Sequence, residues 1–253
     1  MRRLIAFPCA GETLVGTLDT AAGTTGLLIV SGGNEIRCGA HRGMALLAAA
    51  VAAAGHPVFR YDRRGIGDST GDNRGFLKAC DDLLAASATF REAMPQVERI
   101  IGFGNCDAAS TLALFGRAAG IDRLLLANPW TVEDPDDLPP TAAIRATYRQ
   151  RLTDPGAWAK LLTGRIDFGK AVRGLRKAAA SSPQTLATRV VAAIADWGDA
   201  ATVLLAKGDA TAQAYRAASP LPAQIIDTAS HSFARVDDQR QLRAAMMAVL
   251  ADP

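Results

Sequence analysis

The chain has 253 residues, of which 49% are hydrophobic and 21% are charged, and its formal net charge is +3. This composition is typical of a globular protein, and so small a charge gives no reason to expect nucleic acid or a membrane as a partner. We find no stretch that fits a signal peptide and no apolar run long enough to span a membrane. The four cysteines lie far apart, without metal-site spacing, so we expect reduced thiols, a cytoplasmic location, no metal and no cofactor.

Strand and helix patterns alternate over the first half of the chain. Residues 4–7 and 13–18 are predicted to form a hairpin around Gly11. The patterns that follow predict a strand at 26–30, a helix at 40–54, a strand at 57–61, a helix at 77–94, a strand at 97–103, a helix at 107–118 and a strand at 123–127. Strands separated by helices of this length indicate parallel β-α-β units.

The alternation stops between residues 129 and 198. This segment has helical patterns at 141–152, 156–162, 168–178 and 184–197, and strand patterns return only at 202–206 and 223–226, before a last helix at 237–250. We therefore predict a mostly parallel sheet flanked by helices. Together with the strand-to-helix turn Gly104-Asn105-Cys106-Asp107-Ala108, described below, this indicates an α/β-hydrolase fold. Its core is formed by residues 1–128 and 199–253, and residues 129–198 form a helical lid over the carboxyl ends of the strands, where such sheets bind ligands.

A candidate nucleophile lies where the strand at 97–103 turns into a helix. The sequence Gly104-Asn105-Cys106-Asp107-Ala108 has the layout of the G-x-S-x-G nucleophile elbow, with sulfur in place of the serine oxygen. A cysteine at a helix N-terminus is held where free N–H groups and the macrodipole favour a thiolate. The alternative is a buried structural cysteine that begins an ordinary helix.

A cysteine nucleophile needs a base and an acid that orients the base. His231 lies in a polar loop after the last predicted strand, whereas His56 opens a strand at the wrong end of the sheet. Asp209 ends the preceding strand, so Cys106, Asp209 and His231 follow the nucleophile–acid–base order of α/β-hydrolases. Asp209 could instead cap the short helix that follows it, and Asp227 is the rival acid.

Two backbone N–H groups are expected to bind the oxyanion of the reaction. One belongs to Asp107, the residue after the nucleophile, and the other to Gly33 or Asn34 in the glycine-rich loop at residues 31–35. The Asp107 carboxylate has two opposing effects. Its negative charge disfavours a thiolate at the neighbouring Cys106, but a negative charge at the N-terminus of a helix is stabilised by the macrodipole.

Further candidates surround the predicted site. Glu35, Arg37 and His41 lie in or near the glycine-rich loop and could bind an anionic group of the substrate, although surface charge also explains them. Trp130 and Tyr148 could line an acyl pocket under the lid, or pack between the lid and the core.

Several separated motifs together resemble one family. They are residues 31–42 (SGGNEIRCGAHR), 61–69 (YDRRGIGDS), 104–110 (GNCDAAS), 128–130 (NPW) and 148–152 (YRQRL). In these motifs the chain resembles the exosortase A system-associated hydrolase 1 family, α/β-hydrolase-like proteins encoded with bacterial exopolysaccharide and protein-sorting loci. The resemblance implies an acyl-directed hydrolase with a cysteine nucleophile. Asn105 departs from the larger apolar residue expected beside that cysteine.

The chemistry predicted from these residues is hydrolysis of an ester or thioester through a thioacyl-enzyme on Cys106. A small-molecule acyl compound is therefore the expected partner. The motif is equally compatible with an acyltransferase that uses a sugar or another hydroxyl as acceptor. Two hypotheses of other classes are a non-catalytic binding protein of a polysaccharide assembly system and a redox sensor, in which Cys38 would pair with Cys106.

Overall fold

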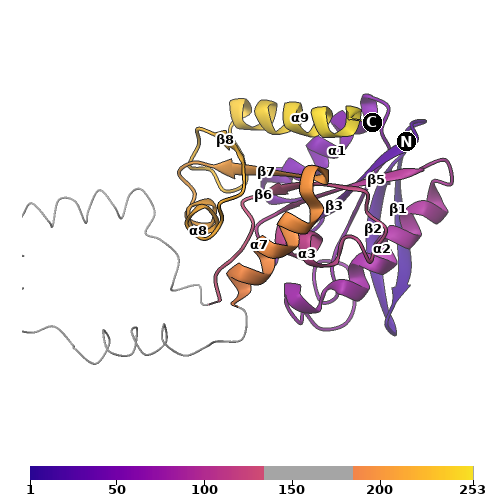
Figure 1. The fold of residues 1–253 in the computed structure, drawn as a ribbon. Helices are drawn as coiled ribbons and strands as arrows, with labels where there is room; N and C mark the ends of the chain where they lie inside the picture. The colour runs from indigo at the N-terminus through magenta and orange to yellow at the C-terminus, as the bar shows by residue number, and fades with distance from the viewer. Residues whose placement is uncertain (134–184, 253) are drawn as a thin grey trace, which may run out of the picture.

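The computed structural model describes residues 1–133 and 185–252, which contain an eight-stranded sheet (Figure 1). The strands are β1 Arg2–Cys9, β2 Glu12–Asp19, β3 Thr25–Val30, β4 Val58–Tyr61, β5 Arg99–Asn105, β6 Arg123–Ala127, β7 Ala201–Ala206 and β8 Gln224–Ile226. They lie in the order β1-β2-β4-β3-β5-β6-β7-β8. β2 pairs antiparallel with β1 and β4, and every other pair is parallel, which confirms the mostly parallel sheet.

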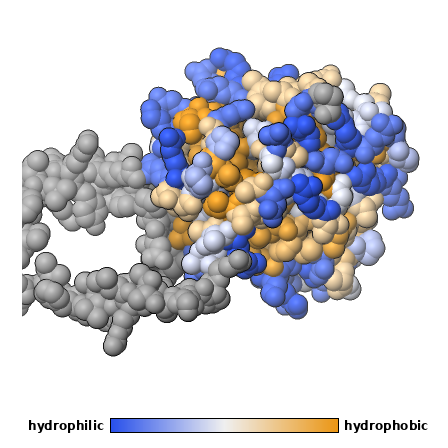
Figure 2. All heavy atoms as spheres, in the orientation of Figure 1, coloured by the Kyte–Doolittle hydropathy of each residue, from blue (hydrophilic) through white to orange (hydrophobic). Residues whose placement is uncertain are grey.

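Helices cover both faces of this sheet (Figure 1). α1 Gly43–Ala53 and α9 Val236–Ala251 pack on one face, and α2 Cys80–Ala93, α3 Asp107–Phe115 and α7 Leu186–Trp197 pack on the other. α8 Ala210–Ala218 connects β7 to β8, and the short helices are η1 Ala40–Arg42, η2 Phe76–Lys78 and η4 Gly198–Ala200. Figure 2 shows hydrophilic and hydrophobic residues interspersed over the face in view.

The central strands are buried on both faces because each face supports its own helix layer. All six residues of β3 are buried. Leu28 and Val30 pack into the core under α2 and α3, whereas Leu27 and Ile29 pack into the core under α1 and α9. This explains why the sequence of β3 is continuously apolar rather than alternating.

The helix predicted at 40–54 is two helices. η1 and α1 meet at a kink, where His41 and Arg42 have positive φ angles of 50° and 61°, and α1 begins only at Gly43. The prediction extended the apolar helical pattern of residues 43–54 back to residue 40, across His41 and Arg42, whose backbone dihedrals create the break.

The part of the predicted lid that the structure describes belongs to the core. Val190, Ile194 and Trp197 of α7 are buried, and the indole Nε1 of Trp197 donates to the carbonyl of Ala113 in α3 at 3.0 Å. α7 is thus a layer helix rather than a cover over the strand ends. The helices predicted at 141–152, 156–162 and 168–178, and with them Tyr148, lie outside the described residues. No helix among residues 1–133 and 185–252 has the length and apolarity needed to cross a membrane.

Candidate active site

Cys106 lies at a sharp turn between β5 and α3. Its φ and ψ angles are 64° and −128°, a conformation that costs energy for any residue other than glycine. A Cβ atom at Gly104 would lie 2.7 Å from the backbone carbon of Ala108, so only glycine lets the strand and the helix approach so closely. The Cys106 N–H donates to the carbonyl of Ala127 at 3.0 Å, which fixes the turn to β6. The half-buried thiol is thus held at the carboxyl edge of the sheet.

Asp209 and His231 meet beside this turn. The His231 Nδ1 lies 2.9 Å from Asp209 Oδ1, and because a carboxylate only accepts, the ring nitrogen donates. The second oxygen, Asp209 Oδ2, accepts from the N–H of Ala212 at 2.9 Å and caps α8. Asp209 therefore combines both predicted roles, contact with the imidazole and helix cap. The rival Asp227 is exposed and pairs instead with Lys207 at 3.2 Å.

The Cys106 side chain lies close enough to His231 to act on the pKa of the imidazole. Since Nδ1 is held by Asp209, Nε2 is the nitrogen that faces the sulfur. Burial lowers the pKa of His231, but the hydrogen bond to Asp209, the contact with Cys106 and the charges of both groups outweigh it and raise the pKa from 6.5 to about 10. The imidazole therefore binds a proton tightly near neutral pH, beside a sulfur that can carry negative charge.

Two asparagines hold the His231 loop from behind. Asn105 Nδ2 donates to the backbone carbonyl of His231 at 3.0 Å, and Asn128 Nδ2 donates to Asn105 Oδ1 at 2.9 Å. Asn128 is fully buried and its Oδ1 accepts from the N–H of Ala206 at 2.8 Å. The sequence analysis did not predict this pair. The sequence feature that could have indicated it is an asparagine at the end of β5 and another directly after the neighbouring β6.

The glycine-rich loop approaches the elbow closely. A Cβ atom at Gly32 would lie 2.6 Å from the carbonyl oxygen of Asn105 and 2.8 Å from Asp107 Oδ1. The N–H of Gly33 donates to Asp107 Oδ1 at 2.7 Å, so this predicted oxyanion donor already has an acceptor. In the part of the chain that the structure describes, the N–H groups of Asp107 and Asn34 form no such backbone or side-chain contact.

Arg63 supports this loop from below. Its side chain is 4% exposed, its Nη2 lies 3.8 Å from Asp107 Oδ2, and it also donates to the carbonyl of Gly33. Arg63 thus links the two ends of the Gly33–Asp107 contact and supplies the positive charge that the Asp107 carboxylate needs. This residue was not among the predicted site residues.

The remaining predicted site residues lie apart from this group. Arg37 has a structural role, because its guanidinium forms ion pairs with buried Asp62 and, at 2.9 Å, with Asp68. Glu35 and His41 are exposed near the loop.

Trp130 is half-buried and adjoins the elbow through its backbone. Its N–H donates to the carbonyl of Cys106 at 3.2 Å, and its own carbonyl accepts from Ser110 Oγ at 2.7 Å. These contacts place the backbone of Trp130 directly beside the elbow.

Comparison with known proteins identifies the fold. No protein-family model matches the chain, and a search of curated proteins found no match either. Among solved structures, the α/β hydrolase GrgF from Penicillium sp. sh18 is 16% identical, with a TM-score of 0.63 over 99% of this chain and 98% of that one. The esterase Pf2001 from Pyrococcus furiosus is 13% identical, with a TM-score of 0.64 over 99% and 89%.

A third similar structure is XC6422 from Xanthomonas campestris, described as an α/β serine hydrolase without a lid. It is 14% identical, with a TM-score of 0.57 over 100% of this chain and 97% of that one. Sequence identities this low show a shared fold but do not show a shared activity. The chain has the α/β-hydrolase fold, as its sequence predicts.

Proposed function

We propose that the chain is an acyl hydrolase that cleaves a small-molecule ester or thioester through a thioacyl-enzyme on Cys106. The observation that carries this proposal is the hydrogen bond between Asp209 and His231 beside Cys106, with the cysteine at a strained turn from strand to helix. Strain of this kind persists where surrounding structure imposes it, and at such a turn it exposes the side chain at the carboxyl edge of the sheet. The solved structures that share this fold include esterases, which agrees with the reaction class.

The proposed reaction begins when His231, held by Asp209, takes the proton of the Cys106 thiol. The Cys106 thiolate attacks the carbonyl carbon, and N–H groups of Asp107 and Asn34 stabilise the oxyanion. The tetrahedral intermediate collapses, His231 gives its proton to the leaving alkoxide or thiolate, and a thioester to Cys106 remains. The now neutral His231 takes a proton from water, the resulting hydroxide attacks the thioester, and the acid and free Cys106 are released.

A thiolate nucleophile favours activated substrates over amides. When the tetrahedral intermediate collapses, the better leaving group departs, and a sulfur is a better leaving group than an amine. We therefore expect esters and thioesters to react and amides to fail.

The family resemblance suggests in which bacterial system the proposed reaction takes place. The motifs at residues 31–42 and 104–110 support membership of the exosortase A system-associated hydrolase 1 family, and with it a link to bacterial exopolysaccharide or protein-sorting systems. The free, widely spaced cysteines support a cytoplasmic location.

The test is to incubate wild type, Cys106→Ala and Cys106→Ser with p-nitrophenyl esters and acyl thioesters of several lengths and to follow intact mass. A single acyl adduct in wild type, absent from Cys106→Ala, is the expected result. Loss of the adduct in water means hydrolysis, and faster loss with an added sugar, with an acylated sugar formed, means that the protein is an acyltransferase instead. If no adduct and no turnover are seen with any acyl donor, covalent acyl chemistry is excluded and a binding protein is favoured. A peroxide-dependent disulfide between Cys106 and Cys38 would favour the redox sensor.

A further inference from the structure

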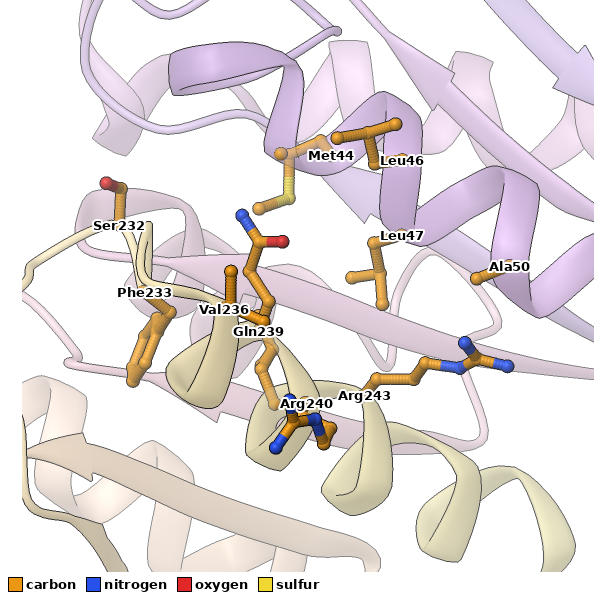
Figure 3. Close-up of a pocket in the computed structure, with 12 residues that line it drawn as sticks. Met44, Leu46, Leu47, Ala50, Ser232, Phe233, Val236, Gln239, Arg240 and Arg243 are labelled. Atoms are coloured by element: carbon orange, nitrogen blue, oxygen red, sulfur yellow. The ribbon is translucent and has the colours of Figure 1, made fainter.

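A cleft separate from the Cys106 site lies between α1 and α9 (Figure 3). Its volume is about 380 Å³, within the range of pockets that hold small molecules. Met44 and Leu47 reach into it from α1. Leu46 and Val236, which also line it, are 51% and 71% exposed. The cleft therefore leaves apolar surface in contact with water.

One end of this cleft is positively charged. Arg243 lies at the end opposite Ser232 and Phe233 (Figure 3), is exposed, and has no ion-pair partner among the residues that the structure describes. Arg240 also lines the cleft, and its guanidinium is shared with Asp237 at 2.8 Å. Arg243 is thus the cation available to an incoming anion.

The other end leads toward the candidate active site. A smaller cavity shares Met44, Ser232 and Phe233 with the cleft and extends to Glu35 and Asn105, the residue before Cys106. The carboxylate of Glu35 disfavours an anionic group at this end. Charge therefore orients an amphiphile with its anionic head at Arg243 and its tail toward Phe233.

We propose that the α1–α9 cleft binds a long-chain carboxylate, with the carboxylate on Arg243 and the aliphatic chain along Met44 and Leu47. A negative head with an apolar chain matches the positive end and the apolar walls of the cleft, whereas a cationic or a neutral chain matches only the walls. The binding itself does not depend on the proposed acyl chemistry.

The experiment measures dodecanoate binding by calorimetry on Cys106→Ala, which removes any turnover. One site per chain and a raised Tm are expected, because a ligand that binds only the folded state stabilises it. Arg243→Glu is expected to weaken binding by at least about tenfold. Ala50→Trp, which places an indole in the cleft, should abolish it. The matched controls Arg189→Glu, on α7, and Ala49→Trp, on another side of α1, should bind like the parent.

Ligands of other charge and length complete the test. Dodecyltrimethylammonium and hexanoate should bind at least about tenfold more weakly than dodecanoate, since one lacks the negative head and the other the chain. Dodecanoate that binds Arg243→Glu as tightly as the parent, or that lowers Tm in every variant alike, would overturn the proposal. So would equal binding of the cationic chain.

A connection to the active site rests on the proposed function and is measured separately. Phe233, buried and with a positive φ of 53°, follows His231 by two residues and lines both cavities. Bound dodecanoate is therefore expected to change kcat for a short acyl ester, with KM unchanged. A rise in KM alone would place dodecanoate in the Cys106 site and overturn the separate cleft, while an absence of turnover would count only against the proposed function.

Discussion

Two aspartates of the candidate active site, Asp107 and Asp209, occupy similar positions in the fold but contact different groups. Each lies at the start of a helix that follows a parallel strand, and each divides its two oxygens between a backbone N–H and a second group. Asp209 caps α8 and holds the His231 imidazole, whereas Asp107 holds the N–H of Gly33 and pairs with Arg63.

The side chain that each aspartate contacts, His231 for Asp209 and Arg63 for Asp107, distinguishes their roles. The contact with Asp209 helps to raise the pKa of the His231 imidazole, so this carboxylate acts on a group that can transfer a proton. The carboxylate of Asp107 instead contacts the guanidinium of Arg63 and the N–H of Gly33, neither of which transfers a proton in the proposed reaction, so Asp107 positions its neighbours. The role of a carboxylate beside a nucleophile is therefore indicated by its partner more than by its place in the motif.

The largest effect is expected from Asp209→Asn. The amide keeps the helix cap, because asparagine caps as well as aspartate, but it no longer favours the Nδ1–H tautomer or a positive ring. We expect kcat/KM for an acyl ester to fall by about 10²–10⁴-fold with little change in Tm. Steady-state kinetics and thermal melting measure the two effects.

Asp227→Asn is the matched control, since its carboxylate is exposed and pairs with Lys207 rather than with His231. It should retain full activity. Equal losses in the two variants would remove the distinction between the two acids and with it the assignment of Asp209.

Asp107 is expected to give a smaller and graded effect. In Asp107→Asn the amide oxygen still accepts from Gly33, so kcat should stay within about threefold of wild type. In Asp107→Ala the loop loses its anchor and Arg63 loses its partner, and we expect kcat to fall by about 10–100-fold, as when one oxyanion donor is displaced. Single-turnover acylation rates of the two variants give the comparison.

An acylation rate that rises in Asp107→Ala, instead of falling, would be equally informative. If Asp107→Ala acylates faster than wild type, the carboxylate obstructs the N–H of Gly33, and that group, rather than the N–H of Asn34, is the second oxyanion donor.

The sequence predicted the order of strands and helices and the three residues that meet at the site, because each rests on a local pattern: an apolar run, a Gly-x-Cys-x-Ala turn, a polar loop after a strand. It left Asp209 and Asp227 as alternatives, and only the structure shows which one faces His231. Contacts between distant segments that belong to no such pattern were not predictable. The Arg63–Asp107 and Asn105–Asn128 pairs depend on which loops adjoin, and no single segment encodes that.

Asn105→Leu tests how far the placement of His231 depends on the hydrogen bond that Asn105 donates to its backbone carbonyl. The larger apolar residue expected at this position cannot donate to the His231 carbonyl, although Asn128 still does so at 3.3 Å. We expect the free energy of unfolding to fall by about 1–2 kcal/mol and kcat to fall by no more than about tenfold. Denaturant titration and ester hydrolysis measure these effects, and a loss of activity as large as that of Asp209→Asn would show that the asparagine pair positions the base.

The smallest effect is expected in the pH dependence of stability. The pKa of His231 is raised to about 10 in the folded protein, above 6.5 in the unfolded chain, so the folded state binds the proton more tightly. The stability that follows from this difference is fully present below pH 6.5 and is lost as pH rises toward 10. The side chain is 40% exposed, so solvent weakens the contribution. The difference in unfolding free energy between wild type and Asp209→Asn should therefore narrow from pH 6.5 to 10. A difference that stays constant over this range would mean that Asp209 does not raise the His231 pKa, and the contrast with Asp107 would lose its electrostatic basis.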